Sequence, residues 1–551
     1  MEHYLSPLEY LYRWEAEIPD KVYLREPVND RYHELTWKET GQEVRKMAGY
    51  LKSLNLPEKS RIAILSKNCA HWVITDLAIM MAGHIAVPLY PNLTADTLGQ
   101  IITHSESELI FVGKLDNYED MKAGISGDLP CISFPLYPRE EHLQWNNLVS
   151  EVKPVTENLV MDPNDTATII YTSGTTGMPK GVMHRFYNFA FVSHWFLQKD
   201  GLNMRPGERF FSYLPLCHIA EKILVQMGSL SVGGVISFAE SLNTFSRNMQ
   251  DAELTVFLAV PRIWTKFEQA ILAKIPLKKL RFYLSVPVLS GIIKRKISKN
   301  LGLQHARHIF TGAAPIPPTL LEFFARLDIH IQEAYAMTEN CCYSHVNRKD
   351  NIKIGTVGQP FPPCEVQISK DGEILIKHEA IMTGYFKEPG ITAETFTEDG
   401  FLRTGDEGSI DEEGFLKITG RVKDLFKSSK GKYIAPAPIE LILLENDDFD
   451  QVCVVGNGIP QPIALAVLTP DKARKSEAEL SDSLNKTLKS VNQRLDHHEM
   501  LAKLVILHEE WNIENGLLTP TLKVKRKMID QKYSSHYESW SEKEGGKVTW
   551  V

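Results

Sequence analysis

YTSGTTGMPKG, residues 171–181, joins three glycines, several hydroxyl side chains and one lysine in a run that suits neither a helix nor a strand. It continues TATIIYTS (166–173), whose apolar, β-branched residues predict a buried strand leading into a loop. Glycine allows positive φ and close approach of the backbone, so free N–H groups can form an anion-binding nest. The hydroxyl donors and the positive charge of the lysine also favour binding of an anion. We therefore expect a polyphosphate-binding loop made by Thr172, Ser173, Gly174, Thr175, Thr176, Gly177 and Lys180.

This loop differs from a Walker A motif, in which the lysine directly follows the second glycine. Here Met178 and Pro179 separate Gly177 from Lys180, and Gly181 follows the lysine. Composition alone leaves an ordinary Ser/Thr/Gly surface loop as the alternative. The order S-G-T-T-G-x-P-K-G is far more restrictive than the composition, and it favours phosphate binding.

The whole chain has 551 residues, too many for a single core, and a formal net charge of -8. That charge argues against a general nucleic-acid binder. The seven cysteines show no zinc-like pairing, which favours reduced thiols in a reducing compartment. The acidic, amphipathic start does not resemble a signal peptide, and no apolar run of about 18 residues predicts a membrane span. We expect a cytoplasmic protein, with peripheral membrane contact left open.

Strand and helix patterns alternate through the first 420 residues, which predicts βαβ units and mainly parallel sheets. RIAILS (61–66) and SELIFVG (107–113) are typical buried strands. Residues 365–420 instead place short strands between Asp-Gly and Glu-Gly turns, which indicates a small antiparallel or barrel-like unit. A stretch rich in Lys, Ser, Gly and Pro then precedes an α+β module. The predicted division is an N-terminal domain 1–420, a hinge 421–427 and a C-terminal domain 428–551.

Several segments together resemble one family. SGTTGMPKG is similar to the phosphate loop of the adenylate-forming superfamily, which includes acyl-CoA synthetases, luciferases and peptide-synthetase adenylation domains. Further segments resemble that family's motifs in the family's order, across nearly the whole chain. The resemblance implies a large α/β N-terminal region of mainly parallel sheets with a small barrel-like subdomain, and a small mobile α+β lid. These segments are YLPLCHIAEK (213–222), TGAAPIPP (311–318), EAYAMTEN (333–340), RTGDEG (403–408), GRVKDLFK (420–427) and LTPTLKVKRK (518–527).

The resemblance implies a site for ATP. Asp406 would accept hydrogen bonds from the ribose hydroxyls, with Arg421 as a second ribose or phosphate contact. An aspartate at such a position can also merely shape its turn. Tyr335 would offer its ring to adenine, and Thr338 its hydroxyl to the α-phosphate. The adenine side would be completed by Gly312, Ala313, Ala314, Glu333 and Ala334.

The resemblance also implies the groups that act on the reacting atoms, with Thr176 of the loop among them. Glu339 is the expected Mg²⁺ ligand, together with Thr172, because hard oxygen ligands suit that ion. Lys523 would offset the negative charge of carboxylate and α-phosphate as they approach. Leu522 stands where the family usually has glycine, and further basic residues follow Lys523 in LKVKRK. His218 would line the carboxylate pocket, since no H-E-x-x-H pattern supports a zinc site.

The hinge candidate is Lys423, about which the family swings its C-terminal domain between two half-reactions. A hinge must absorb a change in φ and ψ, and the Ser- and Gly-containing stretch after Lys423 suits that. The alternative is a plain exposed linker.

The carboxylate substrate is indicated only by motif variants. LAVPRIWTKF (258–267) resembles a segment of long-chain members, where Trp264 would gate the acyl tunnel; a structural core tryptophan is the alternative. LTPTLKVKRK also resembles the corresponding segment of the long-chain members of the family. Residues 277–300 are apolar in the middle and basic at both ends, so they predict either membrane docking or an ordinary surface hairpin.

The expected activity is ligation of a long-chain fatty acid to coenzyme A through acyl-AMP, using ATP and Mg²⁺. One alternative keeps the chemistry but changes the acid to a medium-chain or aryl one, or the acceptor to a carrier protein. A second is a non-catalytic nucleotide- or acyl-binding protein. A homodimer is also left open.

Overall fold

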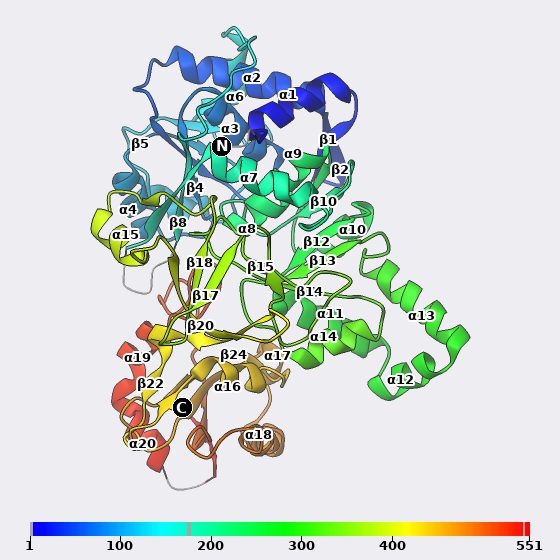
Figure 1. Ribbon diagram of the computed structural model, residues 1–551, viewed down its shortest axis with the longest axis vertical. Coiled ribbons are helices and arrows are strands. Elements are labelled where there is room, and N and C mark those ends of the chain that lie inside the picture. Colours follow the sequence, from blue (N-terminus) through cyan, green and yellow to red (C-terminus); the bar gives the residue numbers. More distant parts are fainter. Residues whose placement is uncertain (1–3, 173–177, 544–545) are drawn as a thin grey trace.

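The computed structural model describes residues 4–172, 178–543 and 546–551, arranged along one long axis (Figure 1). The N-terminal helices α1 (Pro7–Glu17) and α2 (Trp37–Ser53) lie toward one end, and the last helices lie toward the other. Two large, mainly parallel sheets form the frame, together with smaller antiparallel sheets and one small mixed sheet. This architecture confirms the predicted α/β class.

The first large sheet contains the strand that leads into the glycine-rich loop. β3 pairs in parallel with β4 and β5, and β4 pairs in parallel with β8, which confirms the strands predicted in residues 61–66, 107–113 and 166–173. These strands are apolar almost throughout because both faces of the sheet are covered. The strand order is β19 (Gly384–Tyr385), β9 (Lys180–Arg185), β8 (Thr166–Thr172), β4 (Ile85–Leu89), β3 (Arg61–Leu65), β5 (Ser107–Val112), β6 (Cys131–Ser133) and β7 (Leu143–Gln144).

The second large sheet delivers four of the motifs to one edge. β10, β12, β13 and β14 are neighbours and run parallel. The segments 213–222, 258–267, 311–318 and 333–340 lie at or directly after their carboxyl ends, the edge at which open α/β sheets bind ligands. The strand order is β16 (Gln359–Pro360), β15 (His345–Val346), β14 (Gln332–Tyr335), β13 (His308–Thr311), β12 (Val256–Ala259), β10 (Arg209–Ser212), β11 (Val235–Phe238), β1 (Val22–Val28) and β2 (Arg31–Thr36).

One core cluster spans both large sheets and includes the apolar helices α3 (Ala70–Met81) and α7 (Phe186–Leu197). Both helices are buried around most of their circumference, as a helix without a polar face must be. Other helices are α4 (Ala95–Ser105), α5 (Tyr118–Met121), α6 (Trp145–Ser150), α8 (Ile219–Glu221), α9 (Gly228–Val232), α10 (Phe245–Asp251), α11 (Pro261–Lys274), α12 (Leu277–Ser285), α13 (Pro287–Asn300) and α14 (Pro318–Ala325).

The predicted antiparallel unit forms a four-stranded sheet within residues 365–421. Its turns use glycines with positive φ, including Gly372 and Gly414 after acidic residues, as the Asp-Gly and Glu-Gly pattern predicted. The strand order is β17 (Glu365–Ile368), β18 (Glu373–Lys377), β20 (Leu402–Ile410) and β21 (Leu416–Arg421), with α15 (Pro389–Thr395) inserted before β20.

The C-terminal unit is built on another four-stranded sheet. Its two core clusters contain only residues after 425. The boundaries of the division stay a prediction. The sheet consists of β24 (Phe449–Val455), β25 (Ile463–Leu468), β26 (Lys503–Leu507) and β27 (Val548–Trp550), preceded by the hairpin β22 (Phe426–Lys427) and β23 (Tyr433–Ile434). Its helices are α16 (Pro436–Leu443), α17 (Pro470–Ala473), α18 (Glu477–Asn492), α19 (Arg526–Tyr533) and α20 (Tyr537–Glu542).

Two predictions about the whole chain concern cysteines and membrane spans. All seven cysteines are free. Within the described residues, no helix combines the length and the apolar character needed to cross a bilayer.

Candidate active site

Asp406, the ribose candidate, lies on β20 opposite Arg421 of β21. Arg421 Nε donates to its Oδ1 at 2.8 Å, and Tyr335 Oη donates to its Oδ2 at 2.7 Å. Within the described residues, the carboxylate makes no bond to its own turn, where Thr404 Oγ1 instead accepts from Asp406 N. This arrangement argues against the turn-shaping alternative. It also unites predicted nucleotide contacts from two different sheets.

Tyr335 does more than present the ring predicted for adenine. Its side chain is almost wholly buried, and its hydroxyl holds the carboxylate of Asp406 in one orientation. Sequence patterns do not reveal this role, because the two residues are 71 positions apart and no local pattern links them.

Lys523 follows a tight turn in the C-terminal unit. Leu522 N donates to Thr519 O, and Thr519 N donates to Lys523 O, both at 2.8 Å, which closes a three-residue hairpin loop. Leu522 has a φ of +61°, the left-handed conformation that the last position of such a loop requires. A leucine there costs roughly 1–2 kcal/mol, which accounts for the glycine usual at this position in the family. The backbone before Lys523 therefore keeps the left-handed turn although leucine replaces glycine.

Lys523 lies close enough to Asp406, Arg421 and His218 for their charges to influence one another, although no hydrogen bond joins it to them within the described residues. Burial and the positive charge of Arg421 lower the pKa of Lys523, while Asp406 opposes that shift. Burial, reinforced by Lys523, lowers the pKa of His218 to about 4, so the imidazole is neutral at neutral pH. Lys523 and His218 nonetheless keep access to solvent. Lys523 is exposed on the C-terminal unit, and His218 is half-buried on the N-terminal part.

Glu339, the Mg²⁺ candidate, belongs to a second cluster. Tyr385 Oη, from β19, donates to Glu339 Oε1 at 2.8 Å, and Lys180 Nζ lies 5.0 Å from the centroid of the same tyrosine ring. Tyr385 thus connects the lysine after the phosphate loop with the acidic side chain. Tyr385 was not among the predicted site residues, because it lies 46 residues after Glu339 and no local pattern marks it.

The residues around Glu339 fit a magnesium ion bound together with phosphates. Among the described residues, no group of three or more His, Cys, Asp or Glu side chains could hold a metal. Mg²⁺ does not need such a cage, because it usually takes one or two carboxylates with substrate phosphates and waters. Only Oε1 of Glu339 carries a hydrogen bond within the described residues, which leaves Oε2 available as a ligand.

Replacing Tyr385 with phenylalanine removes the hydroxyl that orients Glu339. We expect the Mg²⁺ concentration for half-maximal pyrophosphate exchange to rise about tenfold, as for loss of a group that orients a ligand. Tyr433→Phe, at an exposed tyrosine of β23, is the matched control. An unchanged Mg²⁺ dependence in Tyr385→Phe would contradict the positioning role.

Thr338, the α-phosphate candidate, is held through its backbone by His184 of β9. The imidazole Nε2 donates to Thr338 O at 2.8 Å, and Nδ1 accepts from Asn188 at 3.1 Å. His184 is fully buried, and burial lowers its pKa to about 4, so it stays neutral. Because 154 residues separate His184 from Thr338, only the fold reveals this support.

The adenine-side candidates lie at the carboxyl ends of β13 and β14, which pair in parallel there. A Cβ at Gly312 would come within 3.0 Å of Ala334 O, so glycine allows the two segments to pack closely. Glu333 is nearly buried, and burial raises its pKa to about 8. Its carboxyl group is therefore mostly protonated at neutral pH, which suits a hydrogen-bond donor. Ala313 and Ala314 are exposed at the edge.

Of the phosphate-loop candidates, only Thr172 and Lys180, at the two ends of the loop, lie within the described residues. Thr172 ends β8, and its register partner on β9 is Lys180, so the two ends of the loop lie side by side. Ser173, Gly174, Thr175, Thr176 and Gly177 lie outside the described residues, and their roles stay predictions.

His218 caps a short helix: its Nδ1 accepts from Ala220 N at 3.2 Å. Glu221, three residues later, is buried, and its Oε1 accepts from Ser212 Oγ and from Tyr213 N. Burial raises the pKa of Glu221 to about 8. A buried carboxyl group that is protonated over much of the neutral range therefore lies close to His218 in the chain.

Glu221 makes stability depend on pH. Between its ordinary pKa of 4.5 and about 8, the folded chain holds a proton that the unfolded chain lacks. The free energy of unfolding therefore falls as pH rises through this window, by at most about 1.4 kcal/mol per pH unit. Glu221→Gln, which mimics the protonated group, is expected to flatten this slope in urea titrations. A variant with the wild-type slope would contradict the assignment.

Trp264, the gate candidate, is fully buried on α11. Its ring packs edge-on against Phe257, Phe267 and Phe324 at centroid distances of 5.7, 5.7 and 5.1 Å. A core tryptophan and a closed gate both have this environment, so the gating role stays a prediction.

The hinge candidate Lys423 is exposed, in the short helical turn Val422–Asp424 that follows β21. Asp424 lies 3.6 Å from Arg526, whose guanidinium also donates to Glu440 at 2.5 Å and to Val454 O at 2.6 Å. Arg526 therefore holds the C-terminal unit together. Asn92 Nδ2 donates to Pro520 O at 3.0 Å, which joins the turn before Lys523 to the N-terminal part.

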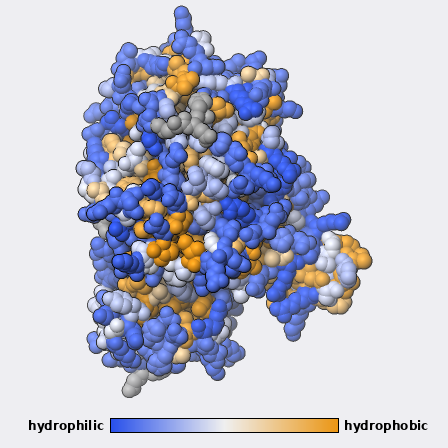
Figure 2. Space-filling model, in the orientation of Figure 1, coloured by the Kyte–Doolittle hydropathy of each residue, from blue (hydrophilic) through white to orange (hydrophobic). Residues whose placement is uncertain are grey.

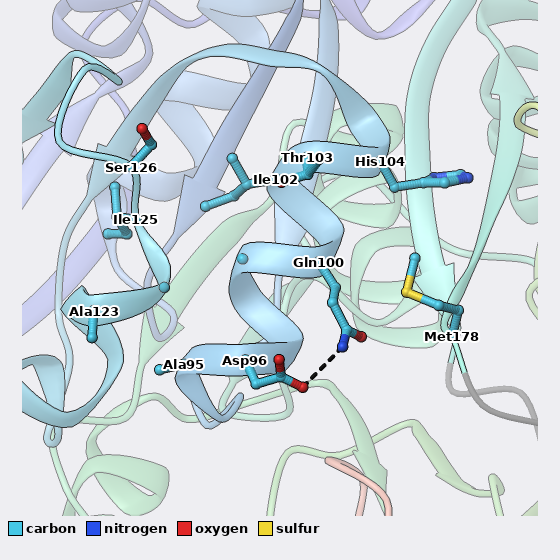
Figure 3. Close-up of a pocket in the computed structure, with 12 residues that line it drawn as sticks. Ala95, Asp96, Gln100, Ile102, Thr103, His104, Ala123, Ile125, Ser126 and Met178 are labelled. Atoms are coloured by element: carbon cyan, nitrogen blue, oxygen red, sulfur yellow. Dashed lines mark hydrogen bonds between the residues drawn. The ribbon is translucent and has the colours of Figure 1, made fainter.

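A pocket beside the glycine-rich segment lies apart from these clusters (Figure 3). It has a volume of 720 Å³ and lies between α4, residues 123–126 and Met178. Figure 3 shows Gln100 reaching Asp96 on the same helix, with His104 and Met178 on the side of the strands. Its lining includes one carboxylate and no Lys or Arg. The pocket therefore lacks the charge that phosphate binding needs.

Known proteins support the assignment of the motifs. The AMP-binding enzyme family matches residues 11–386, and the AMP-binding enzyme C-terminal domain matches residues 423–544. The long-chain-fatty-acid–CoA ligase FadD15 of Mycobacterium bovis is 28% identical, covering 97% of this chain and 96% of that protein. The long-chain-fatty-acid–CoA ligase ACSBG2 of Xenopus laevis is 26% identical, covering 96% and 82%.

Solved structures share the fold. The anthranilate CoA ligase AuaEII in complex with anthranoyl-AMP has a TM-score of 0.79 at 20% identity, covering 97% of this chain and 98% of that one. The o-succinylbenzoate CoA synthetase MenE of Bacillus subtilis has a TM-score of 0.74 at 23% identity, covering 96% and 98%. With a family match over most of its length and the ordered motifs in place, the chain belongs to the AMP-binding enzymes, the adenylate-forming superfamily.

Proposed function

We propose that the protein activates a long-chain fatty acid with ATP, forms acyl-AMP and transfers the acyl group to coenzyme A. The observation that supports the proposal is that Lys523, a residue of the C-terminal unit, lies within electrostatic range of Asp406, Arg421 and His218. A cation from one part of the chain thus meets the nucleotide candidates of the other. This is the arrangement that the first half-reaction needs.

In the first step, a carboxylate oxygen of the fatty acid attacks the α-phosphorus of ATP, and the bond to pyrophosphate breaks. Asp406 and Arg421 bind the ribose, with Tyr335 holding Asp406 in place. Lys523 offsets the charge of the approaching carboxylate and α-phosphate. Glu339 and Thr172 would hold Mg²⁺, which neutralises phosphate charge when bound. Thr338 and the loop residues, Thr176 among them, orient the phosphates.

In the second step, the C-terminal unit rotates about Lys423 and removes Lys523 from the site. The sulfur of coenzyme A attacks the acyl carbonyl carbon, the thiol proton is lost, and the bond to AMP breaks. Neutral His218 and the protonated carboxyl of Glu221 leave the acyl side of the site without added negative charge.

The long-chain acid is supported by the relatives named as long-chain-fatty-acid–CoA ligases, which match nearly the whole chain. Trp264 is proposed as the residue that gates the acyl tunnel. An aromatic acid is the second candidate, because the solved structures of similar fold include anthranilate and o-succinylbenzoate CoA ligases.

The test is AMP release from Mg·ATP and coenzyme A with carboxylic acids of increasing chain length, alongside benzoate and anthranilate. We expect the highest kcat/KM with long-chain fatty acids and no acyl transfer when coenzyme A is omitted. Preference for the aromatic acids would overturn the substrate. Acyl-AMP formation without transfer to coenzyme A would indicate a carrier-protein acceptor, and no AMP with any acid would indicate a binding protein.

A further inference from the structure

Helices α12 and α13 form an arm, here called the basic hairpin (277–300), that projects sideways from the body of the molecule (Figure 1). Leu280 and Ile297, 2% and 5% exposed, anchor its base in the core cluster that contains Trp264 and Ile271 of α11. The hairpin is therefore attached to the helix of the gate candidate.

The far end of the basic hairpin is apolar. Phe282, Val288, Leu289 and Ile292 lie around the turn between the two helices and are 61%, 74%, 37% and 57% exposed. Figure 2 shows hydrophobic side chains gathered on the outer end of this projection. Exposed apolar side chains scattered singly are ordinary, but a group on one protruding tip marks an interaction surface.

The rest of the basic hairpin carries only positive charge. The segment contains no Asp or Glu, although the chain as a whole has a net charge of -8. Within the described residues, only Lys294 of the basic side chains in this segment makes an ion pair, with Asp328 at 3.0 Å. The positive charge of the other six is therefore available to a partner. The seven basic residues are Lys278, Lys279, Arg281, Lys294, Arg295, Lys296 and Lys299.

The order of side chains along α13 separates the apolar tip from the charges. Val288 and Ile292 are one turn apart, and Arg295, Lys296 and Lys299 follow on the side toward the base. At 1.5 Å per residue, about 4.5 Å of helix lies between Ile292 and Arg295, and about 10 Å between Ile292 and Lys299. Amphipathic segments at a bilayer surface bury their apolar side chains about 5–10 Å below the headgroups. The spacing along the hairpin matches that depth.

We infer that the basic hairpin docks on an anionic lipid bilayer, with its apolar tip inserted and its Lys and Arg side chains on the lipid phosphates. The contact is peripheral, because helices of 9 and 14 residues are too short to span. A second copy of the chain is disfavoured as the occupant, because a two-fold contact would bring these positive charges together. The consequence for catalysis rests on the proposed function: α11 and Trp264 would lie beside the membrane that supplies fatty acid.

The first experiment measures binding of the full chain to vesicles of phosphatidylcholine alone, and of phosphatidylcholine mixed equally with phosphatidylglycerol. We expect binding to the mixed vesicles only, weakened by added salt. Arg295→Glu/Lys296→Glu should lower the partition coefficient at least about a hundredfold. Each substitution removes a positive charge and adds a negative one, and each unit of charge near an anionic surface contributes about fivefold. Lys486→Glu/Lys489→Glu, with the same charge change on exposed positions of α18, is the matched control and should lose less than about fivefold.

The second variant tests insertion of the tip. Val288→Ser/Ile292→Ser keeps every charge, and we expect it to lower the partition coefficient about tenfold. Both altered side chains are exposed, so the fold should persist, which circular dichroism checks. Equal binding by wild type and both hairpin variants, or no vesicle binding by wild type, would overturn the inference. Self-association of wild type in sedimentation velocity, lost in the tip variant, would make the hairpin a protein interface instead.

Turnover of fatty acid dispersed in detergent separates this inference from the proposed function. If both hold, the hairpin variants keep wild-type turnover in detergent but lose the stimulation that anionic vesicles give to wild type. Failure of wild type to form acyl-CoA in detergent would sink the proposed function, while vesicle binding would still decide the role of the hairpin.

Discussion

Lys523→Ala is expected to lower acyl-AMP formation, measured as pyrophosphate exchange, by about 10²–10³-fold, the range for loss of one group that stabilises developing charge. Lys523 is the cation that the C-terminal unit brings to Asp406, Arg421 and His218. Transfer from supplied acyl-AMP to coenzyme A should change far less, because the proposed rotation removes Lys523 from the site.

Lys527→Ala is the matched control, since Lys527 is exposed on α19 and lies only four residues away. Arg526 is unsuitable, because its bonds to Glu440 and Val454 hold the C-terminal unit together. Equal pyrophosphate exchange in wild type and Lys523→Ala would show that the lysine is misassigned.

The pH profile gives a second readout for Lys523. Because burial and Arg421 lower its pKa, the ammonium loses its proton at a pH below the ordinary lysine value. Pyrophosphate exchange should therefore decline as pH rises through that lowered pKa. Lys523→Arg should move this decline to higher pH, since arginine stays charged.

Asp406→Ala is expected to weaken ATP binding by roughly 10²–10⁴-fold, because two hydrogen bonds from ribose hydroxyls to a carboxylate contribute about 1.5–3 kcal/mol each. The variant also leaves Tyr335 Oη and Arg421 without their shared acceptor. Isothermal titration calorimetry with ATP measures the effect directly.

The control for Asp406 is Glu412→Ala, which removes an exposed carboxylate from the turn of the same β-hairpin. Thermal unfolding of both variants separates binding from stability. If Asp406→Ala lowered stability but left ATP affinity unchanged, the carboxylate would only shape the local structure, and its ribose role would be lost.

Local patterns were enough to predict much of this protein. Apolar, β-branched runs form the expected strands at 61–65 and 166–172, because backbone preference and period are properties of neighbouring residues. Asp406 and Arg421 fall opposite each other because both lie in one hairpin, where turn and register follow from nearby residues. The glycine position before Lys523 likewise keeps its left-handed φ even with leucine.

Only the tertiary structure decided which distant groups meet. Tyr385 reaches Glu339 across 46 residues, and His184 reaches Thr338 across 154, because sheet order and strand register set these distances. No periodicity encodes such pairs, since contacts between distant elements depend on how whole layers pack. The sequence by itself determined the elements, the motifs and the chemistry they could support. The packing of those elements determined the pKa of Lys523, the orientation of Asp406 and the exposed tip of the basic hairpin, because burial and proximity exist only in the folded chain.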